Sequence, residues 1–593
     1  MPSRRVSWAI SGNEVALQTD SGNLLTSWVS GDSSAALMAT ISDDDAMPAG
    51  AGGDVAGSYA TTPTDDAYRY VSQAPTPLSG SGGNIAALMA GSKWTSVDAA
   101  SGKTVITFSF SDPLTSTFDY SNNDYQSTLT SFSAADRQVT RDVLTRIEAV
   151  CNVKFVEVAD NATECGVLRY GYSQEPNKMN FAGYTFFPSS GAIGGDVWIG
   201  TNQSSSQWDF YRPDLLLHET LHALGLKHPF DSGAVLPTQQ DIIANTVMSY
   251  STVAGSTGGY MSKYPGEPMT LDIAALQYLY GAADSNTGDT RYDLASANYQ
   301  SGFHAIWDSG GIDVLDASGV GRAVALDLNQ GASSDIGSSV SASGTLAGAS
   351  VSTVYTATLS IALGAVIENA IGSAFNDSLI GNDSANRLDG GAGDDRLEGR
   401  AGNDVLVGGP GNNILDGGDG VDTAVFASSR ASYTITNTAQ GLVVSGPGST
   451  DTLLNVERLA FSDGCVALDL CGNAGTSAKV IGAVFGAGFV QNAGAMGICL
   501  SLLDAGMSEQ DLVHLALDCR LGPNAGNEAV VNLLLTNLTG AAPAATQTDT
   551  FVNLIEQGAF SQASLGQIAA ETALNAAHID LVGLSNNGIE YMG

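Results

Sequence analysis

Four residues in one short stretch have the types and spacing of a metal site: His218, His222, Gly225 and His228. A helix predicted over 215–224 places the first two histidines one turn apart on the same face, about 6 Å along the axis, so both imidazoles can reach one ion. Gly225 can adopt the left-handed conformation that ends a helix, which lets His228 arrive as a third ligand from another direction. Three protein ligands leave one coordination position open, and a catalytic Zn²⁺ needs an open position.

Glu219 lies directly after the first of these histidines. From there its carboxylate can take a proton from a zinc-activated water without binding the metal itself. Spacing alone therefore predicts a zinc hydrolase in which His218, His222 and His228 hold one Zn²⁺ and Glu219 is the general base. The competing interpretation, that these histidines only pack on or cap a helix, requires a five-position pattern to arise by chance in a chain with 6 His.

The residues of this site resemble those of a known family. The spacing HExxHxxGxxH is similar to that of the metzincin zinc endopeptidases. The triplet MSY at 248–250, together with Pro229 directly after the third histidine, resembles the serralysin subfamily. The resemblance implies that Met248 forms a turn beneath the zinc, and that Tyr250 is a zinc ligand that swings away to stabilise the transition state. The reaction it implies is hydrolysis of peptide bonds.

A strand expected at 194–200, before the zinc helix, is similar to the family's edge strand. Extended substrates pair with such a strand through backbone hydrogen bonds. This resemblance implies that the substrate strand contains Gly195, Asp196, Val197 and Trp198. The segment 268–281 also resembles the serralysin helix that leads out of the protease domain.

Other elements are expected to support the site. The segments 105–110 and 153–158 have the composition of strands, and Ser133 with Asp136 at the capping-box position predicts the start of a helix. This part of the chain is therefore expected to mix α and β structure.

A second pattern repeats every nine residues from 372 to 425. Glycine opens each repeat, Asp or Asn occupies position six, and Leu or Ala occupies position eight. Such repeats are typical of a calcium-binding parallel β-roll, in which glycines permit tight turns, carboxylates bind Ca²⁺ and leucines fill the core. The alternative, a flexible Gly- and Asp-rich linker, would not keep leucine in phase. The predicted calcium-binding residues are Asp377, Asp395, Asp404, Asp422, Gly390, Gly393, Gly399, Gly402, Gly408 and Gly411.

Some repeats depart from this pattern. The first two lack glycine at position four, and Asn386 and Asn413 replace aspartate at position six, so weaker sites are expected there. Upstream, the segment 307–316 resembles the calcium-associated segment that precedes the repeats in serralysins. This resemblance adds Asp313 to the predicted calcium ligands.

The chain is too long for one core and is expected to form several domains, with a multidomain α+β fold. The expected parts are a largely irregular leader or pro-segment at 1–85, a metzincin-type zinc protease domain at 86–265, a calcium-binding β-roll domain at 266–470 and an α-helical domain of unknown role at 471–593. Two helix-cap signals support the last part, Ser508 with Asp511 and Ser564 with Gln567.

Charge and hydropathy exclude several classes of partner. Asp and Glu number 61 against 23 Lys and Arg, and the net charge of −38 repels phosphate backbones and anionic lipids. Nucleic acids and membrane surfaces are therefore not expected partners. The longest apolar run, 480–490, has 11 residues, too few to span a bilayer.

The cysteines fall into three neighbouring pairs, which allows two interpretations. They form three local disulfides if the protein works outside the cell, or they are six reduced thiols. The pairs are Cys151 with Cys165, Cys465 with Cys471, and Cys499 with Cys519.

The N-terminal sequence has no apolar stretch of signal-peptide length. Carboxylates crowded in the repeats repel one another at low cytosolic calcium, so the β-roll is expected to fold only where calcium is millimolar. This suits the type I secretion machinery, which is the export route that the family resemblance implies. The segment 589–593 does not show the serralysin-type export signal. The helical domain is a candidate for carrying the export signal, anchoring the enzyme or binding a surface partner, and a stabilising C-terminal cap is an equal alternative.

These patterns together predict a secreted, calcium-dependent zinc metalloendopeptidase that cleaves extracellular proteins or peptides. The predicted cofactors are one catalytic Zn²⁺ and several structural Ca²⁺. The alternative is a calcium-stabilised surface or adhesive binding protein with a residual or latent protease domain, and the presence of both Glu219 and Tyr250 favours the enzyme. No cysteine precedes Cys151, so a pro-segment thiolate on zinc is excluded, and latency would need another ligand or steric blocking.

Overall fold

The computed structural model describes residues 7–11, 14–18, 71–73, 83–118, 123–581, 583–584 and 588–592. The chain divides into two units, residues 1–46 and 47–593. In the first unit, β1 (Ser7–Ser11) and β2 (Glu14–Gln18) form an antiparallel hairpin. In the second, β3 (Val71–Gln73) pairs with β4 (Ser92–Trp94). Most of the leader predicted at 1–85 lies outside the described residues.

A five-stranded sheet supports the zinc segment. It contains β5 (Thr104–Phe110), β6 (Val153–Glu157), β7 (Leu168–Ser173), β8 (Gly183–Thr185) and β9 (Asp196–Gly200). The strand order is β6-β5-β7-β9-β8, and all neighbours are parallel except the pair of β8 and β9. The three strands predicted from the sequence, at 105–110, 153–158 and 194–200, correspond to β5, β6 and β9.

The prediction that 195–198 lie on the edge strand is wrong. Strand β9 has hydrogen-bonded neighbours on both sides, because Val197 is paired with Tyr170 of β7 and Trp198 with Tyr184 of β8. Gly195, Asp196, Val197 and Trp198 are all buried. The edge strand next to them is β8, whose three residues are too few to show a strand pattern in the sequence.

Helices α3 (Ala134–Val150) and α5 (Arg212–Ala223) pack with this sheet, and α6 (Thr270–Tyr280) packs against α3. Helix α3 begins at the predicted capping box, in which the Asp136 N–H donates to Ser133 Oγ at 3.1 Å. Helix α5 carries the zinc motif, and all of its 12 residues except Pro213 are buried. A helix buried on every side is a core helix, so its position is determined by packing all around it.

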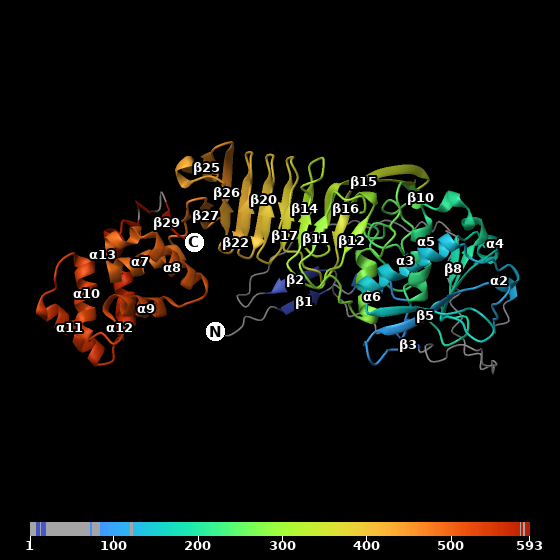
Figure 1. Ribbon diagram of the computed structural model, residues 1–593, viewed down its shortest axis with the longest axis horizontal. Coiled ribbons are helices and arrows are strands. Elements are labelled where there is room, and N and C mark those ends of the chain that lie inside the picture. The colour runs from blue at the N-terminus through green and yellow to red at the C-terminus, as the bar shows by residue number, and fades with distance from the viewer. Residues whose placement is uncertain are drawn as a thin grey trace. The chain divides into compact units, whose positions relative to one another are not determined.

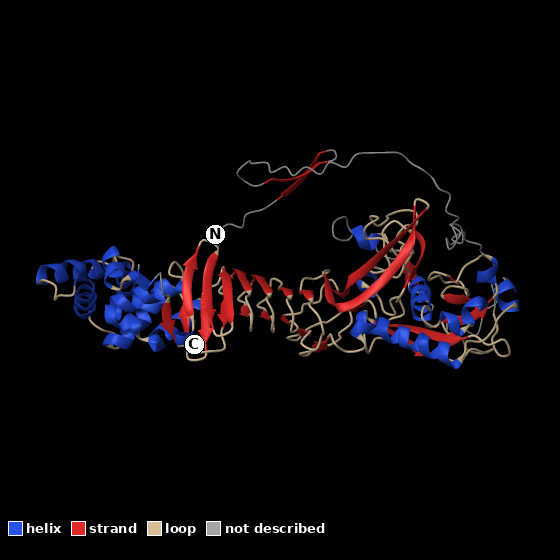
Figure 2. Ribbon diagram, turned by 90° about the horizontal axis from the view of Figure 1, so that it is seen from above, coloured by secondary structure: helices blue, strands red, loops and turns tan. Residues whose placement is uncertain are grey.

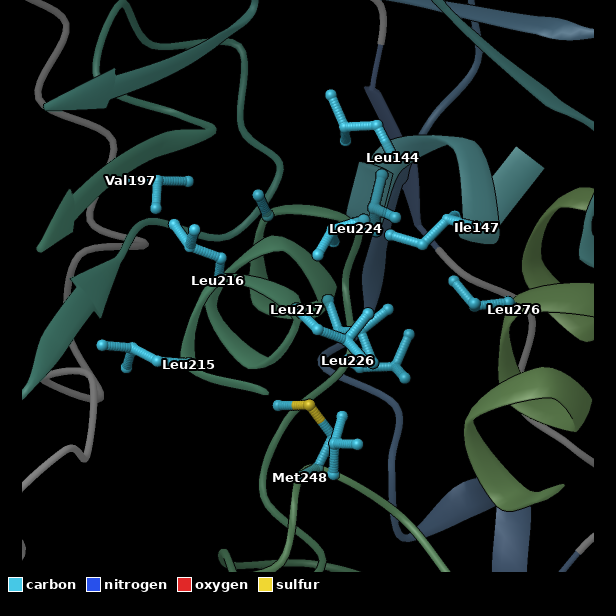
Figure 3. Close-up of a cluster of buried hydrophobic side chains, with 14 of the residues drawn as sticks. Leu144, Ile147, Val197, Leu215, Leu216, Leu217, Leu224, Leu226, Met248 and Leu276 are labelled. Carbon is cyan, nitrogen blue, oxygen red and sulfur yellow. The ribbon is translucent and has the colours of Figure 1, made fainter. Parts of the chain in front are cut away.

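Figure 3 shows the side chains around this central helix. Leu144 and Ile147 come from α3, Val197 from β9 and Leu276 from α6, and all four are almost fully buried. Met248 packs in the same cluster and is fully buried. The core of this region therefore surrounds the element that carries the first two histidines.

Short elements complete this region. They are α1 (Gly83–Ala86), α2 (Asn123–Ser127), α4 (Glu175–Lys178), β10 (Thr257–Met261) and two short 3-10 turns at Thr201–Ser204 and Ser206–Trp208.

Residues 291–467 form strands, joined by turns, in two sheets of mainly parallel pairing. The strands are β11 (Arg291–Asp293), β12 (His304–Ile306), β13 (Val314–Asp316), β14 (Ala325–Asp327), β15 (Ser333–Leu346), β16 (Ala349–Ile361), β17 (Asn369–Ile371), β18 (Ser378–Ile380), β19 (Arg387–Asp389), β20 (Arg396–Ala401), β21 (Val405–Val407), β22 (Ile414–Asp419), β23 (Thr423–Val425), β24 (Thr434–Thr438), β25 (Gly441–Gly446), β26 (Ser449–Leu454), β27 (Arg458–Phe461) and β28 (Gly464–Ala467).

Each nine-residue repeat contributes one strand, and successive repeats alternate between the two sheets. Strands β18, β20 and β22 pair in parallel in one sheet, with Leu379, Leu397 and Leu415 in register. Strands β17, β19, β21 and β23 pair in the other. The position-eight leucines are fully buried, which explains why the sequence keeps them in phase. Figure 2 shows these strands in red, stacked side by side.

After the repeats, the chain is mainly helical and has its own buried cluster. The helices are α7 (Asn473–Phe485), α8 (Ala493–Asp504), α9 (Glu509–Leu521), α10 (Asn527–Thr539), α11 (Ala545–Glu556), α12 (Gln562–Ala570) and α13 (Ala573–His578). Ser508 caps α9 as predicted, since its Oγ accepts the Asp511 N–H at 3.1 Å. The cap predicted at Ser564 is wrong, because α12 is capped by Ser561, which accepts the Ser564 N–H at 3.0 Å.

The last described residues differ from the helical prediction for 471–593. Strand β29 (Ile589–Tyr591) pairs antiparallel with β28 and so extends one of the two sheets (Figure 1). Ile589 is buried and Glu590 is exposed, the alternation of a strand, but three residues are too few for this pattern to stand out in the sequence. The predicted mixed α+β class is confirmed.

Two further expectations concern helix length and the cysteines. In the described ranges, no helix has both the length and the apolar composition needed to cross a bilayer. All six cysteines carry free thiols, so the structure has the reduced form and not the three local disulfides.

Candidate metal centre

Helix α5 and the turn after it bring three histidines together. His218 and His222 project from α5, and Gly225, at φ +102°, turns the chain so that His228 returns to them. A side chain at Gly225 would collide with the Ser92 carbonyl oxygen, so this close turn requires glycine. His228 Nε2 lies 3.2 Å from His218 Nε2 and 3.1 Å from His222 Nε2.

These distances fit a zinc ion. Ligand nitrogens at 2.0–2.1 Å from a tetrahedral Zn²⁺ are separated by about 3.3 to 3.4 Å. A metal site needs three or more His, Cys, Asp or Glu side chains whose ligand atoms lie close together. In the described part of the chain these three histidines form the one such group, with their ligand atoms all within 4.8 Å of one another. The geometry therefore matches the donor set predicted from the sequence.

Backbone carbonyls hold two of the histidines in the form that binds metal. His218 Nδ1 donates to Val247 O and His222 Nδ1 donates to Leu226 O, each at 2.7 Å. Because a carbonyl oxygen can only accept, the proton is on Nδ1 and the Nε2 lone pair faces the centre. Burial lowers the pKa of His218 to about 4 and holds the pKa values of His222 and His228 below their usual range. All three are neutral at neutral pH, as metal ligands must be.

The predicted methionine turn lies beside the histidines. Met248 is fully buried, and Tyr250 Oη lies 2.8 Å from His228 Nε2. Tyr250 is 39% exposed, so its phenol can meet both a bound ion and a substrate. The ring of Phe230 stacks on His228 with centroids 5.0 Å apart, which the motif analysis did not anticipate.

A buried carboxylate that sequence reasoning missed holds this turn. Asp272 accepts the Thr246 hydroxyl at 2.5 Å and the Val247 N–H at 2.9 Å, while also accepting the Met269 N–H that opens α6. Burial raises the pKa of Asp272 to about 6. The signal available in the sequence was its place three residues after Met269, at the start of a helix.

Glu219 lies against the edge strand. Its Oε2 accepts the Thr185 hydroxyl at 2.6 Å, and a side chain at Gly183 would collide with its Oε1. Glu219 itself is buried. Strand β8, and not β9, therefore places backbone next to the predicted general base.

The repeat region shows a different donor set. At Asp395, Asp404, Asn413 and Asp422, one side-chain oxygen accepts the backbone N–H of the residue 18 positions earlier, as Asp395 does from Asp377 at 2.8 Å and Asp404 from Asn386 at 2.7 Å. The second oxygen is buried and has no hydrogen-bond partner within the described ranges at Asp395, Asp404 and Asp422. Burial raises the pKa of each of these carboxyls to about 6.

The repeat glycines leave room beside those oxygens. A side chain at Gly390 or Gly399 would collide with Oδ2 of Asp395 or Asp404. A side chain at Gly408 would lie 2.5 Å from Asn413 Nδ2. The position-four residues Gly393, Gly402 and Gly411 have φ of +134°, +124° and +144°, a conformation that favours glycine. Buried carboxylate oxygens without a partner, each with cleared space beside it, fit a hard cation such as Ca²⁺.

Two predicted calcium residues differ from each other. Asp313 resembles the repeat aspartates, because Oδ2 has no partner within the described ranges and burial raises its pKa to about 6. Asp377 differs, since its two oxygens accept hydrogen bonds from Val324 N–H and from Ser373. Its hydrogen-bonding capacity is met by the protein itself, as expected for the irregular first repeat.

Comparisons with known proteins agree with these features. Residues 270–451 match the family described as Peptidase M10 serralysin C terminal. Serralysin G of Dickeya chrysanthemi is 33% identical over 288 residues, 44% of this chain and 56% of its own length. Metallopeptidase AprA of Pseudomonas marginalis is 32% identical over 266 residues, 40% of this chain and 52% of its own. Serralysin of Proteus mirabilis is 30% identical over 292 residues, 43% and 56%. The chain spans about half the length of these relatives, and over that span it is similar to serralysins.

Proposed function

We propose that the chain is a secreted, calcium-dependent zinc endopeptidase that hydrolyses peptide bonds of extracellular proteins. The observation that carries this proposal is the convergence of three histidines. His228 Nε2 lies 3.2 Å from His218 Nε2 and 3.1 Å from His222 Nε2. The similarity to serralysins and to a named metallopeptidase supports the reaction class.

The three histidines would hold the zinc, with Tyr250 as a further ligand. When bound, the ion would polarise the scissile carbonyl and make a water molecule a better nucleophile at neutral pH. Glu219 takes a proton from the attacking water and passes it to the leaving amine, while Thr185 keeps its carboxylate in place. Tyr250 Oη donates to the oxyanion that develops at the carbonyl.

The edge strand β8 suggests how a substrate is aligned. A peptide in extended form would pair with the outer edge of β8, the last strand of the sheet, beside Glu219, which orients the scissile bond. Substrate positioning is thereby proposed for the strand at 183–185 and not for the one at 196–200.

The repeats are proposed to form a calcium-binding β-roll. The unpartnered oxygens of Asp313, Asp395, Asp404 and Asp422 support Ca²⁺ binding. Because buried ionised oxygens without a partner are costly, the ion would contribute to folding of this region.

The proposed domain division is the one expected from the sequence, with the protease at 86–265, the β-roll at 266–470 and the helical region after it. Because the repeats would stay unfolded at low cytosolic calcium and fold outside the cell, export by the type I machinery is proposed.

Metal content and proteolysis test this proposal. Purified protein is expected to hold one zinc per chain and to cleave casein in millimolar calcium, and a chelator selective for zinc should stop cleavage. His222→Gln is expected to lose both zinc and activity. His514→Gln is the matched control, because His514 is exposed and lies far from the motif in the sequence. Protein without zinc, or cleavage that survives the chelator, would overturn the proposal.

A further inference from the structure

The loop that follows Tyr250 is held by a hairpin from the repeat region. Strands β15 and β16 form a long antiparallel hairpin, and β10 pairs antiparallel with the outer part of β15, from Ala342 to Thr345. Figure 1 labels all three strands. Only six residues, 251–256, separate Tyr250 from β10, so this pairing holds the chain close to the proposed oxyanion donor.

Two hydrogen bonds connect the hairpin to Thr252, two residues after Tyr250. Thr252 Oγ1 donates to the Ser343 carbonyl at 2.7 Å, and Tyr355 Oη donates to the Thr252 carbonyl at 2.9 Å. Thr252 is 2% exposed. The hydroxyl and the carbonyl of this buried residue are therefore both satisfied by the hairpin, which makes this position costly to move.

The packing between loop and hairpin is close. A side chain at Gly344 would lie 2.5 Å from Ser256 Oγ, and one at Gly259 would collide with Thr252 Oγ1 and with the Ser343 carbonyl. The ring of Tyr355 also packs edge-on against Phe303, with centroids 5.6 Å apart. Packing against Phe303 therefore fixes the Tyr355 ring, and with it the position of the hydroxyl that donates to the Thr252 carbonyl.

The same hairpin is rooted in the first repeat. Its base pairs with β14 at Ala325 and Asp335, and β14 pairs with β18 in register at Leu326 and Leu379. The Val324 N–H, just before β14, donates to Asp377 Oδ1 at 2.7 Å. A continuous hydrogen-bonded path therefore runs from the repeats to the loop at Tyr250.

We infer that this hairpin positions Tyr250 for catalysis, with Tyr355 and Thr252 as positioning residues. The inference rests on the proposed function, in which Tyr250 donates to the oxyanion. Such a donor must be held within about 0.5 Å of its productive place, and Tyr250, itself partly exposed, is carried by a loop that lies outside the helices and strands. The position of Tyr250 would thereby depend on folding of the repeat region, because the two hydrogen bonds at Thr252 connect them.

The first test removes one hydroxyl. Tyr355→Phe should lower kcat about 3- to 10-fold, the value of one net hydrogen bond, and leave KM within about twofold. Zinc content should not change. Thr356→Val is the matched control, because Thr356 is the exposed neighbour of Tyr355 on β16 and successive side chains of a strand point to opposite faces. This variant should keep the wild-type kcat.

Hydrogen exchange followed by mass spectrometry gives a readout that does not need activity. In Tyr355→Phe the peptide covering 249–257 should exchange faster, while the peptide covering α5 should be unchanged. Thr252→Val should resemble Tyr355→Phe, and Thr252→Ser, which keeps the donor to Ser343, should restore kcat.

The outcomes separate the two proposals. If the wild-type protein shows no proteolysis, the proposed function fails, and the exchange data still decide whether the hairpin holds the loop. If the wild type cleaves but Tyr355→Phe changes neither kcat nor exchange at 249–257, the positioning role is overturned. The role would also be overturned if Thr356→Val lowered kcat as much as Tyr355→Phe while exchange at 249–257 stayed unchanged.

Discussion

Thr185 donates its hydroxyl to Glu219 Oε2 across 2.6 Å, so the edge strand of the sheet holds the carboxylate proposed as general base. The same strand passes Glu219 at Gly183, where there is no space for a side chain. One short strand thus has two proposed roles, aligning the substrate backbone and orienting the group that moves the proton.

Loss of this hydrogen bond should slow the reaction. Thr185→Val is expected to lower kcat about 10-fold, because hydrogen bonds to charged groups contribute about 1.5 to 3 kcal/mol and this one orients the base. Thr185→Ser keeps the hydroxyl and should retain most activity. Steady-state kinetics on a fluorogenic peptide measures both, and equal rates for the Val and Ser variants would contradict the role of Thr185.

Asp272 should matter for zinc binding although it is not one of the proposed zinc ligands. It accepts the Val247 N–H, and Val247 O accepts His218 Nδ1, so the carboxylate orients His218 through one peptide unit. Asp272→Asn has too few acceptors for its three donors and should weaken zinc binding about 10-fold or more. Competition with a chromogenic chelator measures this affinity, and an unchanged value would show that the turn holds without Asp272.

Calcium binding by the repeats should depend on pH near 6. Burial raises the pKa of Asp395, Asp404 and Asp422 to about 6 when no ion is present. A raised carboxyl pKa means that ionisation destabilises the calcium-free fold above pH 6, and that this cost is lost as pH falls toward 4. Because Ca²⁺ binds the ionised form, its affinity should rise from pH 5 to pH 7.5 with release of protons. Calcium titrations followed by circular dichroism at the two pH values test this, and equal midpoints would contradict it.

The cleared space beside the repeat carboxylates should be essential. Gly399→Ala places a methyl group against Asp404 Oδ2 and the Gly417 carbonyl, so it should raise the calcium concentration needed for folding several-fold. Gly321→Ala is the matched control, because no atom lies within 4 Å of the added carbon there. Equal calcium midpoints for the two variants would show that the site lies elsewhere.

Local patterns allowed much of the molecule to be predicted from its sequence. His218 and His222 follow from helical spacing, and the buried leucines such as Leu397 follow from the nine-residue period, because both signals repeat within a few turns of chain. The edge strand at Thr185 and the carboxylate at Asp272 could not be predicted in the same way. Their roles depend on contacts with residues 34 and 25 positions away, respectively, and a single sequence shows no pattern for such contacts. The hydrogen bond from Tyr355 to Thr252 is more distant still.

Cleavage of casein by Glu219→Gln tests the central claim most directly. Gln keeps the size and the hydrogen bond with Thr185 but cannot accept the proton, so the account predicts wild-type zinc content and a rate at least about 100-fold lower. Protein that contains zinc and cleaves casein at the wild-type rate without the Glu219 carboxylate would contradict the proposed mechanism.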